Sequence, residues 1–201
     1  MKHSLVILLS AWLAGCSTLG DWGESILGGE DNIDPPAPLV DIEDPVPLKK
    51  LWSTSEGVGE DEQFINLVPA IEDDQLFIAD RDGRVVALDV ETGKKNWAVK
   101  TELAASAGPG VGEGLVLIGT SDAEVLALSA VDGAELWKAS VSSEVLSVPQ
   151  IDLDQVIVQT ADGNVTALDA EDGHQVWIHD RSIPVLTLRG TSTPAVQHGI
   201  V

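Results

Sequence analysis

One segment recurs three times at a constant spacing of 40 residues, and each copy runs from a proline to a tryptophan: 69–97, 109–137 and 149–177. Each copy contains short apolar runs separated by tight-turn residues and closes with a glycine turn and a tryptophan. Repeats of about 40 to 45 residues with this pattern are typical of β-propeller blades, each a four-stranded sheet. The sequence therefore predicts an all-β propeller with its function on loops and faces.

Two strand-like runs around a turn signal recur in every copy, and we expect them to pair as hairpins. These runs are 75–79 with 84–89, 115–119 with 125–128, and 156–159 with 165–168. A glycine able to adopt positive φ follows at Gly93, Gly133 and Gly173. The tryptophans at repeating positions are Trp52, Trp97, Trp137 and Trp177. Their regular placement favours a role in docking one blade on the next over a role as binding-site aromatics.

The first residues have the composition of an export signal. A basic start at Lys2 precedes about a dozen apolar residues, fewer than the roughly 20 that span a bilayer, and residues 1–15 are the predicted signal peptide. Cys16, the only cysteine, follows Leu-Ala-Gly and is either an incidental small residue or an acylation site. Residues 16–50 are acidic and rich in proline and glycine, which predicts a flexible tether.

Residues 51–201 are predicted to hold about three blades. A fourth repeat starts at Pro194, in register with the earlier prolines, and the sequence stops at Val201. Because propellers close with four to eight blades, we expect this chain to be truncated before ring closure.

The repeat spacing lengthens at two connections. The step from tryptophan to the next proline is 12 positions after Trp97 and Trp137 but 17 after Trp177, where residues 181–190 intervene. Insertions in repeat proteins often carry binding surfaces. The same residues could instead lengthen the first strand of the next blade and bury Leu186 and Leu188 in its core. The step after Trp52 is also 17 positions, and we assign no chemistry to it.

Charge and residue spacing exclude several functions. The chain has 33 Asp plus Glu against 11 Lys plus Arg, a net charge of −22, which argues against nucleic acid as a partner. His174, His179 and His198 lack the spacing of a metal site. Residues 110–114 (GVGEG) are expected to form a hairpin turn rather than a phosphate-binding loop.

Two copies carry a family motif. Ala-x-Asp-x-x-x-Gly-x-x-x-Trp at 87–97 and 167–177 resembles the tryptophan-docking motif of PQQ-type propeller repeats, although Ser129 replaces the aspartate in the middle copy. Combined with Leu-Ala-Gly-Cys, the acidic tether and Leu-Trp-Ser at 51–53, the chain resembles the BamB family of outer-membrane β-barrel assembly lipoproteins.

This resemblance implies a function and a place in the cell. Palmitoylation and related acylation of Cys16, followed by Ser17, would place the protein on the periplasmic face of the outer membrane. The family implies a non-catalytic scaffold without cofactor or metal, a monomeric subunit of the BAM complex that assists protein insertion into the membrane. Leu186, Leu188 and Arg189 would contact a BamA-like POTRA domain, and nascent outer-membrane proteins are a further implied partner.

Two other readings remain open. A PQQ-dependent quinoprotein dehydrogenase uses the same repeat, but in the alcohol-oxidising family it needs adjacent cysteines and a calcium site, and the chain has one cysteine. The third reading is a propeller lipoprotein that binds another envelope protein.

Overall fold

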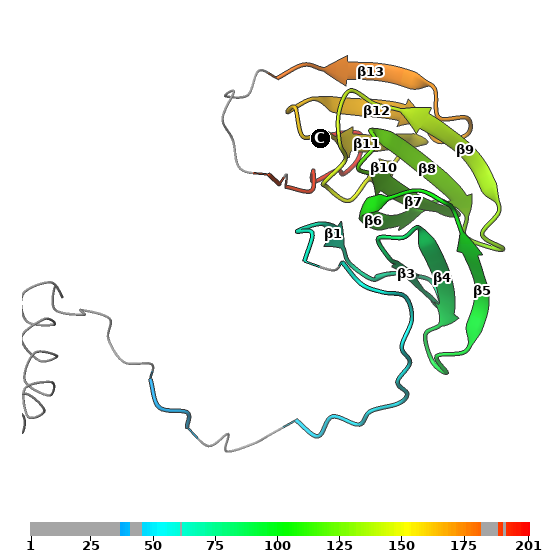
Figure 1. Ribbon diagram of the computed structural model, residues 1–201, viewed down its shortest axis with the longest axis vertical. Coiled ribbons are helices and arrows are strands. Elements are labelled where there is room, and N and C mark those ends of the chain that lie inside the picture. The colour runs from blue at the N-terminus through cyan, green and yellow to red at the C-terminus, as the bar shows by residue number, and fades with distance from the viewer. Residues whose placement is uncertain (1–36, 41–45, 61, 182–188, 191) are drawn as a thin grey trace, which may run out of the picture. The chain divides into compact units, whose positions relative to one another are not determined.

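The computed structural model describes residues 37–40, 46–60, 62–181, 189–190 and 192–201. The chain divides into two units, Met1–Leu48 and Lys49–Val201, and all assigned strands belong to the second (Figure 1). The predicted signal peptide and Cys16 lie outside the described residues. In the part of the chain that is described, no helix has the length and apolar character needed to cross a membrane.

Three four-stranded antiparallel sheets follow one another along the chain, so the predicted all-β blades are confirmed. Blade 1 consists of β2 (Ala70–Glu72), β3 (Gln75–Ala79), β4 (Arg84–Asp89) and β5 (Lys95–Lys100). Blade 2 consists of β6 (Ala105–Gly112), β7 (Leu115–Thr120), β8 (Glu124–Ser129) and β9 (Glu135–Ser140). Blade 3 consists of β10 (Gln150–Asp152), β11 (Gln155–Gln159), β12 (Val165–Asp169) and β13 (Gln175–His179). The last strands, β5, β9 and β13, lie along the outer rim in Figure 1.

The hairpins predicted from the repeat form as β3–β4, β7–β8 and β11–β12, with bounds within one residue of the expected runs. Their central residues are buried on both faces of the sheet; every residue of β7 is buried. Continuous apolar runs such as Leu115–Thr120 suit this position because neighbouring blades cover both sides. The outer strand β9 is mostly exposed, and Trp137 is its one buried residue.

Two hydrophobic clusters hold the blades together. One packs blade 1 against blade 2 around Phe77, Val85 and Ile118. The other packs blade 2 against blade 3 around Leu117, Trp137 and Val156. Burying aliphatic and aromatic surface between sheets is the main source of stability in such an arrangement, because no single blade can cover both of its own faces.

The segment 110–114 differs from the expected hairpin turn. Strand β6 extends through Gly112, and only Glu113 and Gly114 form the turn. A β-carbon on Gly110 would lie 2.0 Å from the carbonyl oxygen of Pro149 at the start of blade 3. This glycine therefore allows two blades to approach closely, a requirement that local sequence cannot distinguish from a turn.

A fifth strand joins blade 2. Strand β1 (Asn66–Leu67) pairs in parallel with β6, matching Asn66 to Ala107 and Leu67 to Gly108. The amide of Val68 continues the ladder by donating to the Gly108 carbonyl at 3.0 Å. This pairing lies in the long connection after Trp52, to which we assigned no chemistry from sequence, and it ties the end of that connection to the second blade.

Candidate functional site: two long connectors joined by Arg189

The tryptophans span the junctions between blades. Trp137 of blade 2 donates from its indole Nε1 to the Ala170 carbonyl of blade 3 at 2.8 Å, and Trp97 donates to the Ala130 carbonyl of blade 2 at 3.0 Å. Trp52 makes the same contact with the Val90 carbonyl of blade 1 at 2.8 Å. Each indole is thus partly buried and hydrogen-bonded across a junction, as expected for a docking residue between blades.

Each of these indoles rests on a glycine of the neighbouring turn. A β-carbon at Gly93 would lie 2.5 Å from Trp52, one at Gly133 would lie 2.7 Å from Trp97, and one at Gly173 would lie 2.5 Å from Trp137. All three glycines have positive φ. Glycine is therefore required twice at this position, for backbone conformation and for space.

Trp177 has a different partner from the other three. Its Nε1 donates to the side-chain oxygen of Gln155 at 3.1 Å, within blade 3. Its ring lines an open hollow together with Val165, Ile178 and Gly199. The repeated position of a tryptophan therefore does not by itself specify its contact, because the acceptor is a carbonyl of the neighbouring turn for Trp97 and Trp137 but a side chain of the same blade for Trp177.

The connection from Trp52 to blade 1 (residues 53–68, connector 1) is anchored by ion pairs. Glu56 lies 2.8 Å from Lys95 and 3.1 Å from Arg84, and its side chain is only 12% exposed. The hydrogen bond from Lys95, with a further one from Arg84, holds the pKa of Glu56 below its ordinary value despite partial burial. Sequence reasoning missed Glu56 because one glutamate among so many acidic residues carries no distinguishing local signal.

The connection from β13 to Pro194 (residues 180–193, connector 2) meets connector 1 through Arg189. The Arg189 Nη1 donates to the carbonyl of Gln63 at 2.6 Å and to that of Phe64 at 3.3 Å. Its Nη2 donates to a carboxylate oxygen of Glu144, in the connection between blades 2 and 3. One guanidinium thus joins three segments that are far apart in sequence.

The predicted docking residues are described in part. Arg189 is at the surface, with 44% of its side chain exposed while it makes these contacts. Leu186 and Leu188 lie outside the described residues. The residues that the sequence failed to single out here are Gln63, Phe64 and Glu144, two of which act through backbone carbonyls that every residue type possesses.

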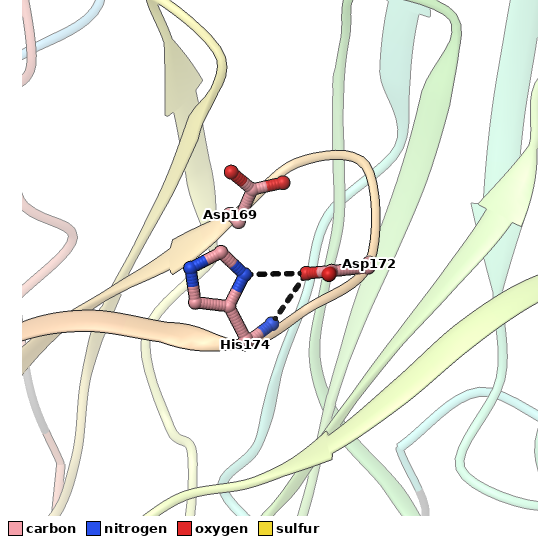
Figure 2. A group of neighbouring side chains, drawn as sticks. All are labelled: Asp169, Asp172 and His174. Carbon is pink, nitrogen blue, oxygen red and sulfur yellow. Dashed lines mark hydrogen bonds and ion pairs between the residues drawn. The ribbon is translucent and has the colours of Figure 1, made fainter.

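A turn in blade 3 groups two carboxylates with a histidine. Figure 2 shows His174 facing Asp172, with Asp169 on the same turn, and potential ligand atoms of the three lie within 4.8 Å of one another. The backbone of the turn accounts for this geometry: Asp169 accepts from the Glu171 amide at 2.8 Å, and Asp172 accepts from the His174 amide at 2.9 Å. Asp89 in blade 1 likewise accepts from the Thr92 amide at 2.8 Å. The group is therefore a turn motif of the repeat.

The fold and these contacts define a class: a β-propeller assembled from tryptophan-docked, four-stranded blades of the PQQ type. The family model described as "Outer membrane protein assembly factor BamB" matches residues 48–105 and 81–201. This protein belongs to the BamB family. A protein of that description from Kangiella koreensis is 52% identical over 172 residues, which cover 86% of this chain and 44% of the relative. One from Xanthomonas campestris is 38% identical over 125 residues, 57% of this chain and 31% of the relative. The chain thus spans less than half of either relative.

Solved structures show the same architecture. The crystal structure of BamB from Moraxella catarrhalis superposes with a TM-score of 0.61 at 28% identity, covering 69% of this chain and 41% of that one. Quinohemoprotein alcohol dehydrogenase from Comamonas testosteroni superposes with a TM-score of 0.50 at 23% identity, covering 57% of this chain and 21% of that one. The second likeness is one of fold alone, since blades of this type serve unrelated functions.

Proposed function

We propose that this protein acts in outer-membrane protein assembly as a non-catalytic scaffold, held on the periplasmic face of the outer membrane by acyl chains on Cys16. The observation that carries the proposal is the family match across residues 48–201. Its relatives from Kangiella koreensis and Xanthomonas campestris bear the name of an outer membrane protein assembly factor. A rigid set of blades with exposed connectors suits a scaffold, because loops on a stable framework are free to bind a partner.

The docking surface in this proposal is connector 2, with Leu186, Leu188 and Arg189 contributing to the contact with a POTRA domain of BamA. Support comes from the Leu-Thr-Leu-Arg-Gly run at 186–190, which resembles the BamA-gripping segment of the family. Arg189 is partly exposed at the meeting point of the two connectors. Arginine with aliphatic neighbours is a frequent composition of binding hot spots.

Affinity capture of BamA tests this docking contact. The natural full-length protein is compared with a Leu186→Ala/Leu188→Ala variant and with Leu136→Ala as a control, because Leu136 is a half-exposed leucine on the outer strand β9. We expect the double variant to recover much less BamA and the control to recover as much as the wild type. Equal recovery by all three proteins, with unchanged circular dichroism, would exclude connector 2 as the docking surface.

The non-catalytic part of the proposal has a separate test. The purified full-length protein is mixed with PQQ and calcium, its absorbance is recorded, and dye reduction is assayed with alcohols. We expect the spectrum of the mixture to equal the sum of the separate spectra of the protein and PQQ, and the dye to stay oxidised. Tight uptake of the quinone with dye reduction would favour the dehydrogenase alternative.

The lipid anchor is tested by fractionation. Cys16→Ala removes the thiol that follows Leu-Ala-Gly, the proposed site of acylation. Two or three acyl chains give an anchor that hardly dissociates, whereas none leaves only weak protein contacts with the membrane. We expect wild-type protein in the outer-membrane fraction and the variant in the soluble or inner-membrane fraction. A variant that stays in the outer membrane after a high-salt wash would contradict acylation at this residue.

A further inference from the structure

Phe64 projects from connector 1 in a conformation that its own side chain does not favour. It is 85% exposed, while the next residue, Ile65, is 8% exposed. Its φ is +53°, in the left-handed region that bulky residues rarely adopt. Residues held in such a conformation are concentrated at sites where the surrounding structure imposes it for a function.

Arg189 contacts the backbone on both sides of Phe64. The carbonyls of Gln63 and Phe64 belong to the two peptide units on either side of the Phe64 Cα. The Nη1 atom of Arg189 donates to both carbonyl oxygens, at 2.6 and 3.3 Å. Fixing both peptide units fixes φ and ψ of the residue between them. The contact of Glu144 with Nη2 holds the guanidinium in place from the other side.

The rest of connector 1 prevents the turn from relaxing. Downstream, strand β1 is hydrogen-bonded to β6, which anchors the chain two residues after Phe64. Upstream, the amide of Gln63 donates to the Glu60 carbonyl at 3.2 Å and closes a tight turn. The aromatic ring is therefore presented outward by a braced segment. Such a side chain loses little conformational freedom when it enters a partner's pocket.

We propose that Phe64, on connector 1, is an anchor residue for the partner that docks on this protein, and that Arg189 is a positioning residue that holds it outward. This inference rests on the proposed function, because the occupant is the same BamA domain. The residues near Phe64 define what that domain must offer, namely an apolar pocket bordered by basic side chains. Glu60 and Glu62 are exposed within four residues of Phe64 in the sequence, and Glu144, which contacts Arg189, has 23% of its side chain exposed. A net charge of −22 over the chain favours the same basic partner.

The anchor is tested with purified full-length protein and the soluble POTRA domains of BamA, using calorimetry or interferometry to obtain Kd. Phe64→Ala should raise Kd about tenfold or more, since a buried aromatic anchor is among the costliest residues to truncate. Phe64→Leu should recover part of that loss. The matched control is Val131→Ala, because Val131 is 82% exposed and lies in the β8–β9 turn of blade 2. Phe64 is not an anchor if Phe64→Ala binds as the wild type does. If the wild type itself does not bind, the proposed function fails, and this inference fails with it.

The positioning role is tested by a double-mutant cycle. Arg189→Lys keeps the charge but replaces the planar guanidinium with a single ammonium, which cannot reproduce the simultaneous contacts with two carbonyls and Glu144. We expect Arg189→Lys to weaken binding in the wild-type background and to have little further effect in the Phe64→Ala background. Equal, additive losses in both backgrounds would show that Arg189 acts by itself, and the positioning role would be wrong.

Discussion

Gly173 packs directly against the indole of Trp137: a β-carbon at Gly173 would lie 2.5 Å from Cε3 of the ring. The two residues come from different blades, and the indole also donates to the Ala170 carbonyl of the same turn at 2.8 Å. Contacts of this kind recur at each described junction between neighbouring blades. The stability of the blade array therefore depends on pairs of residues that are 36 positions apart in blades 2 and 3.

Substituting the indole separates its packing from its hydrogen bond. Trp137 is 6% exposed, and we expect Trp137→Ala to destabilise the protein by about 3–5 kcal/mol. Trp137→Phe keeps most of the apolar contact but leaves the Ala170 carbonyl without this donor, so part of that loss, about 1 kcal/mol or more, should remain. Chemical denaturation of the natural full-length protein measures both. A Phe variant as unstable as the Ala variant would show that aromatic packing contributes little.

A pair of glycines separates steric from conformational requirements. Gly173 and Gly114 have φ of +75° and +77°, but a β-carbon at Gly114 would meet nothing within 4 Å. Gly114→Ala should cost about 1 kcal/mol for the left-handed backbone alone. Gly173→Ala should cost about 1–3 kcal/mol more, because the methyl group displaces the Trp137 indole. Equal shifts in the unfolding midpoint would mean that the turn moves away from the indole without cost.

The ion pairs of Glu56 in connector 1 should contribute less to the stability of the fold at low pH. Because the pKa of Glu56 is lowered by Lys95 and Arg84, its ion pairs stabilise the fold above the unfolded-state pKa of about 4.3, and this stabilisation is lost as pH falls through the folded-state value. Glu56→Gln should therefore cost about 1 kcal/mol at pH 7 and less at pH 3. Thermal unfolding at both pH values measures the difference. Glu91→Gln, in an exposed turn, is the control; a pH-independent loss in Glu56→Gln would contradict the ion-pair explanation.

The pKa of His174 should be higher than that of an ordinary histidine. Its Nδ1 lies 2.6 Å from Asp172, and this hydrogen bond, aided by the charge of Asp172, raises the pKa of His174. The contact therefore stabilises the fold below the unfolded-state pKa of about 6.5, and the effect is lost as pH rises through the folded-state value. NMR titration of the imidazole should show a lower pKa in Asp172→Asn. An unchanged pKa in that variant would mean that the pair does not persist in solution.

Several parts of the blades were predictable from sequence because they depend on local periodicity. The runs 75–79 and 84–89 became β3 and β4 with the expected bounds, since apolar residues at strand spacing and a turn signal between them favour a hairpin on their own. The positive-φ glycines were also readable, because backbone conformation restricts the residue type. The turn expected at 110–114 was three residues too long, because strand β6 continues through Gly112 and Gly110 serves a contact with another blade.

The repeat by itself determined that this protein is built of four-stranded blades and which two connectors are longer than the others. Only the tertiary structure decided that these two connectors meet, with Arg189 bound to the carbonyls of Gln63 and Phe64 and to Glu144. The physical reason is that hairpins form from neighbouring residues whose side-chain pattern is written in the chain. A guanidinium that binds backbone carbonyls 125 and 126 positions away selects its partners by position in space, and any residue could supply those oxygens.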